Sequence, residues 1–405
     1  MKKQIEELIN SFLLDFDQRK LELLDKVLFS LLLKKELLLL EKNNAKEAKK
    51  MEALLAHYHN YRDLIFKKLI RNNPNLDKNL LIKRIYQAPA RLILLITHSC
   101  QLKCRYCRVR KFSDSMKEKV LLKAIDLLFT ANRRDLQLQF FGGEPLLRFD
   151  LVKKAVEYAE KINKTAKRQL TFVLTTNGIA LDKEKIDFFK KHKFLIECSI
   201  DGEIENQLKM RKARDGKNYY KHLLDNLRRL SSSGVNHYSI SVIMPNNVRS
   251  TFKNFRHLTE NGFKRLQTNY SLGVFWPAAT IKILFKETKK ILNYAKKNKN
   301  MEFINLTSIR REPVVLNAEL TVDCDGGIYL ESGICLEEDF KKIKNKFLVT
   351  DLNKAKNINF YNSTQFQNFY RLSRVYSEVN PRFRKIILNN IKLGQDYNRF
   401  LKTEK

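Results

Sequence analysis

Apolar and polar residues alternate along the middle of the chain in a pattern that predicts strands and helices in turn. Six short runs rich in β-branched and aromatic residues predict strands at 91–97, 136–141, 170–176, 194–200, 238–244 and 265–271. Amphipathic stretches of helix length separate them, near 116–130, 150–166, 182–192, 219–233 and 249–261. Strands that alternate with such helices predict parallel pairing through right-handed crossovers. We therefore expect an α/β fold with an open or partial barrel rather than a closed barrel of eight units.

The flanking segments carry different patterns. Leu, Ile and Phe recur at helical spacing in the first part of the chain, with a polar break at 42–50, which predicts a helical hairpin that either packs as plain structure or receives a partner. A β-hairpin is expected over 316–335, because Asp325-Gly326-Gly327 separates two alternating runs. The expected regions are a helical region at 1–85, the barrel at 86–275, a small hairpin-bearing appendage at 276–345 and a basic helical region at 346–405.

Charge and hydropathy narrow the choice of partners only slightly. The 78 Lys and Arg residues against 44 Asp and Glu residues give a formal net charge of +34, which attracts nucleic acid, anionic membranes or acidic proteins. The same Lys-, Asn- and Ile-rich composition also follows from nucleotide bias, and the basic residues are spread along the chain. The most apolar stretch, 27–40, contains three charged residues and is shorter than the ~20 apolar residues that a bilayer span needs. We expect a cytoplasmic protein with no transmembrane segment.

Three of the six cysteines lie together, directly after the first predicted strand. Cys100, Cys104 and Cys107 are spaced so that one loop can turn all three sulfur atoms toward one metal centre. In a long chain of this type, clustered thiols indicate metal binding more often than disulfides. Three thiolates suit an iron–sulfur cubane with one iron left open for a small molecule. The alternative is zinc, with His98 as the fourth ligand.

Further motifs follow the next three predicted strands. The sequence GGEP at 142–145 follows the second, TNG at 176–178 the third, and SIDG at 199–202 the fourth. The carboxyl ends of parallel strands form the edge at which α/β folds bind ligands. The two glycines allow the backbone to approach a ligand closely, although the same residues also make an ordinary turn from strand to helix.

These four motifs, in this order at four strand ends, resemble the radical S-adenosylmethionine superfamily over about residues 90–275. The resemblance implies a partial (β/α)6 barrel. It also implies that Cys100, Cys104 and Cys107 ligate a 4Fe-4S cluster whose open iron is chelated by S-adenosyl-L-methionine. The remaining implied contacts of that cofactor are Tyr106 against the adenine, the backbone of Gly142, Gly143 and Glu144 at the ammonium group, Asn177, Ser199 and Asp201 at the ribose or carboxylate side, and Arg211 at the carboxylate.

The chain departs from the family pattern in two places. Gln101 stands where the family commonly has Asn, and its amide can still form hydrogen bonds in the loop. The segment TVDCDGGIYLES at 321–332 is similar to the opening of the SPASM or Twitch auxiliary-cluster domains, but only Cys324 and Cys335 follow the barrel. We expect that the auxiliary clusters are lost, with rescue by a non-cysteine ligand as the alternative. Cys198, in the fourth strand, is expected to be a buried core thiol.

The resemblance implies an enzyme that cleaves S-adenosylmethionine reductively to a 5′-deoxyadenosyl radical, using a low-potential donor of flavodoxin or ferredoxin type. The spacing of SIDG, Arg211 and the segment 216–220 is similar to that in peptide and protein maturases, so a ribosomally made peptide or a protein is the expected substrate. RNA modification is less favoured because no RNA-binding domain is recognisable. A molybdopterin-precursor cyclase would need a later cysteine triplet. The non-enzyme alternative is a regulator or scaffold that bears a cluster and binds S-adenosylmethionine without turnover.

Overall fold

The structure, a computed structural model, describes residues 34–35, 46–51, 53–54, 90–107, 109, 113–131, 133–307, 319–330, 347–352 and 381–404. The chain divides into two compact units, residues 1–88 with 357–388 and residues 89–356 with 389–405. The features discussed below lie in the second unit, except for the first residues of the helix at 381–404. Most of the helical hairpin expected over 1–85, and Cys335, lie outside the described residues.

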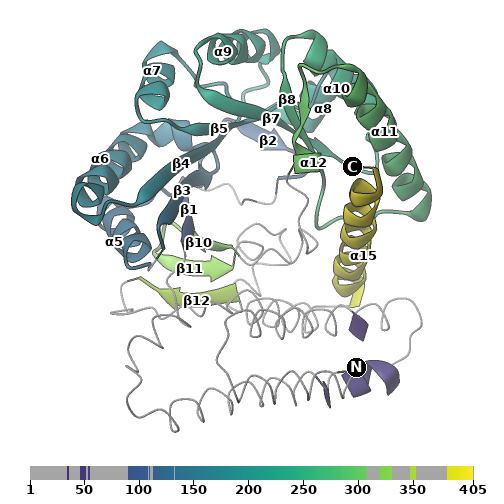
Figure 1. The fold of residues 1–405 in the computed structure, drawn as a ribbon, viewed down its shortest axis with the longest axis horizontal. Coiled ribbons are helices and arrows are strands. Elements are labelled where there is room, and N and C mark those ends of the chain that lie inside the picture. Colours follow the sequence, from purple (N-terminus) through teal and green to yellow (C-terminus); the bar gives the residue numbers. More distant parts are fainter. Residues whose placement is uncertain are drawn as a thin grey trace. The chain divides into compact units, whose positions relative to one another are not determined.

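Six parallel strands form the centre of this unit and follow one another across the sheet in chain order (Figure 1). They are β1 (Arg91–Thr97), β3 (Asp135–Gly142), β4 (Gln169–Thr176), β5 (Leu195–Ser199), β7 (Asn236–Ile243) and β8 (Arg265–Tyr270). Each strand pairs in parallel with the next. The six predicted strands are therefore confirmed in position, order and direction.

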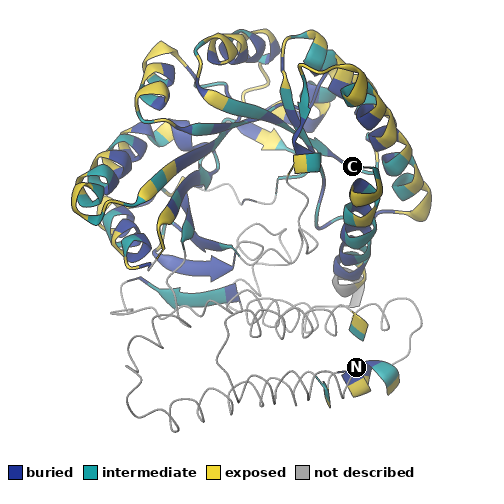
Figure 2. Ribbon diagram, viewed as in Figure 1, coloured by how far each residue is buried: buried dark blue, intermediate teal, exposed yellow. Residues whose placement is uncertain are grey.

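Helices cover the outer side of the sheet, as Figure 1 shows. They are α5 (Glu118–Phe129), α6 (Phe149–Ala166), α7 (Lys183–Lys191), α8 (Ile204–Met210), α9 (Tyr220–Ser232), α10 (Thr251–Glu260) and α11 (Ala278–Lys297). Their inner faces are buried and their outer faces exposed (Figure 2), which is the result that amphipathic periodicity predicts. Buried aromatic rings fill the layer between helices and sheet, with ring centroids of Phe172 and Phe194 5.2 Å apart.

The sheet continues beyond both ends of the six-strand core. The short strand β9 (Glu302–Phe303) pairs in parallel with β8, and α12 (Ile304–Thr307) follows it. On the other side, β10 (Leu320–Val322) pairs in parallel with β1, and β11 (Gly327–Leu330) and β12 (Leu348–Asp351) follow in antiparallel pairing. The described part of the predicted hairpin is thus an extension of the barrel sheet. The two outermost described strands, β12 and β9, are not paired with each other, so the described sheet is a partial barrel.

The last helix, α15 (Pro381–Glu404), holds the loop that follows β8. The Asn390 side chain accepts a hydrogen bond from Gly273 N and donates one to Val274 O, both at 2.8 Å. The neighbouring Asn389 makes the same pair of bonds with the backbone of Trp276. These two amides thus hold the backbone of the loop at 273–276 against α15. Among the described helices, none is long and apolar enough to cross a membrane.

Candidate functional site

A cavity of about 660 Å³ runs along the inside of the barrel. The residues that line its carboxyl-terminal end include nearly all of those that the sequence predicts for the site: Cys100, Cys104, Tyr106, Cys107, Gly142, Gly143, Glu144, Asn177, Ser199 and Arg211. Asp201 lies behind this lining and is buried. The fold therefore brings motifs from four strand ends and the segment after α8 to one cavity.

A small two-stranded sheet holds the cysteine loop. Strand β2 (Leu102–Cys104) pairs antiparallel with β6 (Arg211–Ala213), and Cys104 is the partner of Arg211. The backbone bonds from Arg105 N to Met210 O, 2.8 Å, and from Arg214 N to Gln101 O, 2.9 Å, extend this pairing at both ends. Backbone hydrogen bonds thus hold the cysteine loop against β6. Strands of three residues have no readable periodicity, so the sequence does not predict this pairing.

The three thiols have polar neighbours as well as a shared cavity. Cys100 Sγ accepts hydrogen bonds from Leu102 N at 3.4 Å and from Asn177 Nδ2 at 3.8 Å. Burial raises the pKa of the Cys104 thiol to about 12, against the opposing influence of the Arg211 guanidinium. A buried thiol of this kind ionises when a cation takes its proton's place, and donors to sulfur stabilise the charge that results. The residues present therefore fit an iron–sulfur cluster.

The glycine motif packs directly against the start of the cysteine loop. Gly143 N donates to Thr97 O at 2.6 Å, and Glu144 N donates to Ser99 O at 2.8 Å. A Cβ atom at Gly143 would lie 2.1 Å from Ser99 O, so no other residue fits without a backbone shift. Gly142 has a φ of +138° and meets the Thr97 carbonyl in the same way. The glycines thus allow two strand-end loops to touch.

The Glu144 side chain links the ends of β3 and β4. Its carboxylate accepts hydrogen bonds from Leu146 N at 3.1 Å, Thr176 Oγ1 at 2.8 Å and Asn177 N at 2.8 Å, and the residue is 0% exposed. These donors belong to the protein itself. The carboxylate therefore holds the ends of β3 and β4 together, beside the cavity that Gly142, Gly143 and Glu144 line.

Asp201, Arg211 and Tyr106 form one buried network. The Arg211 guanidinium donates to both carboxylate oxygens of Asp201, with Nε–Oδ2 and Nη2–Oδ1 distances of 3.0 and 3.2 Å. The Tyr106 hydroxyl donates to Asp201 Oδ2 at 2.5 Å, and the guanidinium lies 5.2 Å from the centroid of its ring. Burial holds the pKa of the Tyr106 phenol well above its usual range, so the phenol stays a proton donor. Arg211 is thus engaged by a carboxylate of the chain itself.

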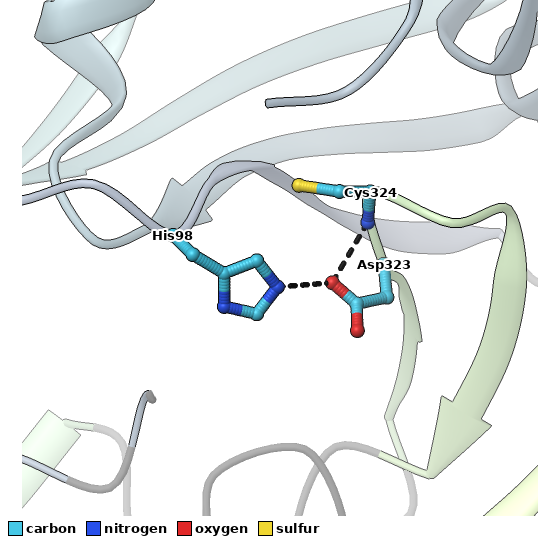
Figure 3. Close-up of side chains that lie close together, drawn as sticks. All are labelled: His98, Asp323 and Cys324. Carbon is cyan, nitrogen blue, oxygen red and sulfur yellow. Dashed lines mark hydrogen bonds and ion pairs between the residues drawn. The ribbon is translucent and has the colours of Figure 1, made fainter. Parts of the chain in front are cut away.

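His98 contacts residues outside the cysteine loop. Its Nε2 atom lies 2.7 Å from Asp323 Oδ1, beside Cys324, in the turn after β10 (Figure 3). Within the described part of the chain, His98 is not among the residues that line the cavity. This placement speaks against a zinc site made of the three loop cysteines and His98. Cys198 is fully buried in β5, as its sequence neighbours predict.

The opposite end of the cavity is a polar floor that sequence reasoning missed. Glu197 accepts hydrogen bonds from the Tyr238 hydroxyl at 2.5 Å, Thr175 Oγ1 at 2.6 Å and Gln139 Nε2 at 3.2 Å. Arg91 joins this network because its Nη2 atom donates a hydrogen bond to Gln139 Oε1. The available signal was the polar side chains at inward positions of otherwise apolar strands. A floor of this kind suits a polar substrate.

Sequence comparison gives the class of this domain. Residues 94–259 match the Radical SAM superfamily. The chain is 26% identical over 185 residues to a cysteine-type anaerobic sulfatase-maturating enzyme of Clostridium novyi, covering 44% of this chain and 49% of that protein. It is 29% identical over 109 residues to the PqqA peptide cyclase of Granulibacter bethesdensis, covering 26% of this chain and 27% of that protein. The chain spans about half the length of the sulfatase-maturating relatives that it matches.

Solved structures agree on the fold. The sulfatase-maturating enzyme anSMEcpe with bound AdoMet and Cp18Cys peptide has a TM-score of 0.62 at 18% identity, covering 78% of this chain and 98% of that one. SuiB of Streptococcus suis bound to S-adenosylmethionine has a TM-score of 0.52 at 15% identity, covering 92% of this chain and 89% of that one. At these identities the likeness concerns the fold alone. Together with the family match, it shows that this chain contains a radical SAM domain built as a partial barrel.

The Glu144 network gives a first prediction. We expect Glu144→Gln to destabilise the barrel unit by about 1–3 kcal/mol, because an amide group replaces an acceptor oxygen that faces buried donors. The measurement is the shift of the urea transition, followed by circular dichroism. Glu157→Gln on the exposed face of α6 is the control, with an expected change within about 0.5 kcal/mol. Equal shifts for the two variants would contradict the assigned role of Glu144.

Proposed function

We propose that this chain is a radical SAM enzyme that modifies a peptide or protein substrate. One observation carries the proposal: three thiols of a single loop, held by β6, face the same end of a barrel cavity as the glycine motif and Asn177. When bound, a 4Fe-4S cluster supplies an electron that cleaves S-adenosyl-L-methionine into methionine and a 5′-deoxyadenosyl radical, which abstracts hydrogen from the substrate. A low-potential flavodoxin or ferredoxin type donor and a cytoplasmic location belong to the same proposal.

Each residue at this end of the cavity receives a role in the proposal. Cys100, Cys104 and Cys107 hold three irons, and the Asn177 amide donates to one of their sulfurs. The backbone of residues 142–144 binds the ammonium group of the cofactor, and Ser199 binds its ribose or carboxylate side. Asp201 and Arg211 position Tyr106, and the Arg211 N–H groups not directed at Asp201 are available to the cofactor carboxylate.

The polar floor supports a peptide or protein as the substrate. Gln139, Thr175, Glu197 and Tyr238 place amide, hydroxyl and carboxylate groups below the cysteine end. Such groups match the amides and polar side chains of a polypeptide. The relatives and structural neighbours, which include sulfatase-maturating enzymes and a peptide cyclase, support the same substrate class. RNA modification rests on net charge alone.

The first test of the function concerns the cluster. The anaerobically purified protein should carry about four irons per chain and form 5′-deoxyadenosine when given S-adenosylmethionine and dithionite. Replacing Cys100, Cys104 or Cys107 by Ala should abolish both, because each thiolate holds one iron. Cys198→Ala, at a buried thiol outside the loop, is the matched control and should keep its iron. Iron retained by the triple Ala variant would refute the assignment of the ligands.

Tyr106 gives a test of cofactor contact. If its ring lies against the adenine, Tyr106→Phe should keep the affinity for S-adenosylmethionine within about threefold, whereas Tyr106→Ala should weaken it by tenfold or more, since a stacked aromatic contact contributes about 0.5–1.5 kcal/mol beyond its buried area. Titration calorimetry on the iron-loaded protein measures both affinities. Equal losses in the two variants would assign the residue's importance to its hydroxyl bond with Asp201 instead.

The substrate class needs a separate experiment. Co-expression with short peptides encoded beside the gene, followed by mass spectrometry, should reveal one peptide whose mass changes with the wild-type chain and stays unchanged with Cys104→Ala. The control removes the cluster but keeps the polar floor. New modified nucleosides in cellular RNA, with every candidate peptide unmodified, would replace the peptide proposal by RNA modification.

A further inference from the structure

A second group of potential metal ligands contains none of the three loop cysteines. His98 follows β1, and Asp323 and Cys324 follow β10 (Figure 3). One ligand atom from each, an imidazole nitrogen, a carboxylate oxygen and a thiol sulfur, lies within 4.8 Å of the other two. Within the described part of the chain, none of these residues lines the barrel cavity.

The pairing of β1 with β10 creates this group. The two strands are parallel, with Ile93 opposite Thr321 and Leu94 opposite Val322, so the residues that follow both strands emerge at the same edge of the sheet. Cys324 Sγ donates to Leu95 O at 3.1 Å, which holds the thiol against β1. The backbone of Asp323 bonds to both Gly326 and Gly327 at 2.9 Å, which fixes the turn. The β1–β10 pairing and the hydrogen bonds of the turn therefore bring the three residues together.

Charge and burial at this group favour a divalent cation. Asp323 and His98 are 2% and 6% exposed. Burial raises the pKa of the Cys324 thiol to about 12, and the nearby carboxylates of Asp323, Asp114 and Asp325 act in the same direction. This is a concentration of negative charge in a chain with a formal charge of +34. A divalent cation with one carboxylate, one thiolate and a neutral imidazole forms a complex without net charge, which lowers the cost of burying it. Nitrogen, oxygen and sulfur donors together fit zinc.

We propose that His98, Asp323 and Cys324 bind a zinc ion that joins the end of β1 to the β10–β11 turn. On binding, the Cys324 thiol releases its proton to solvent and the thiolate coordinates the metal. His98 coordinates through Nε2, with its proton on Nδ1, and the direct His98–Asp323 hydrogen bond is replaced by two bonds to the metal. A water molecule or another ligand completes four-coordination. The ion anchors the chain two residues before Cys100, independently of the cluster.

X-ray absorption at the zinc edge tests the proposal without interference from iron. The full-length protein, prepared anaerobically with its iron and supplied with zinc sulfate, should retain about one zinc per chain after desalting, with one sulfur at ~2.3 Å and nitrogen or oxygen ligands at ~2.0–2.1 Å. Two or more sulfurs per zinc would place the metal on the loop cysteines and overturn the proposal. Failure to retain zinc would also overturn it, leaving His98 and Asp323 as a hydrogen-bonded pair.

Two variants and one control complete the test. Cys324→Ser should lose the sulfur signal and the bound zinc, and Asp323→Asn, which keeps the shape of the side chain, should lose the zinc. His192→Gln removes another histidine–carboxylate pair with the same 2.7 Å separation, to Glu160, and should leave the zinc content unchanged. Stoichiometric zinc in correctly folded Cys324→Ser protein would refute the site. Iron content is read from the same samples, so failure of the cluster assignment is recognised separately.

Discussion

The backbone pairing of Cys104 with Arg211 is the contact on which the geometry of the site depends. It attaches a loop that follows the first barrel strand to a segment more than a hundred residues later in the chain. The thiols, the Asp201–Arg211 ion pair and the Tyr106 ring are thereby held together. In the proposed function, this pairing would orient the three thiols as ligands of the cluster.

The site depends on local charge and burial rather than on the large positive charge of the whole chain. Glu144 and Asp201 are almost fully buried, and each is surrounded by donors or by a guanidinium. Each therefore stays in place without a counter-ion from solvent, at the cost of being unavailable as a free ligand. Glu144 and Asp201, which the sequence predicts as cofactor contacts, thus form hydrogen bonds within the protein.

The barrel cavity has two chemically different ends. The end with the thiols is built from loops at the carboxyl ends of the strands, and the polar floor is built from inward side chains of the strands themselves. Helix α15 also lines the cavity, through Tyr397 and Leu401. In the proposed function, the cofactor would therefore bind at the loops and the substrate would contact the strands, within one cavity.

The sequence by itself determined the barrel strands, their helices and the cysteine motif, because each depends on periodicity or spacing within a short window. It also placed the four motifs at one edge, since parallel strands share their carboxyl ends. Tertiary structure alone decided the β2–β6 pairing, the parallel pairing of β10 with β1, and the partners of Glu144, Arg211 and His98. These contacts join residues that lie far apart in the chain. No local pattern encodes which buried donor meets which acceptor, because that choice follows from the packing of whole elements.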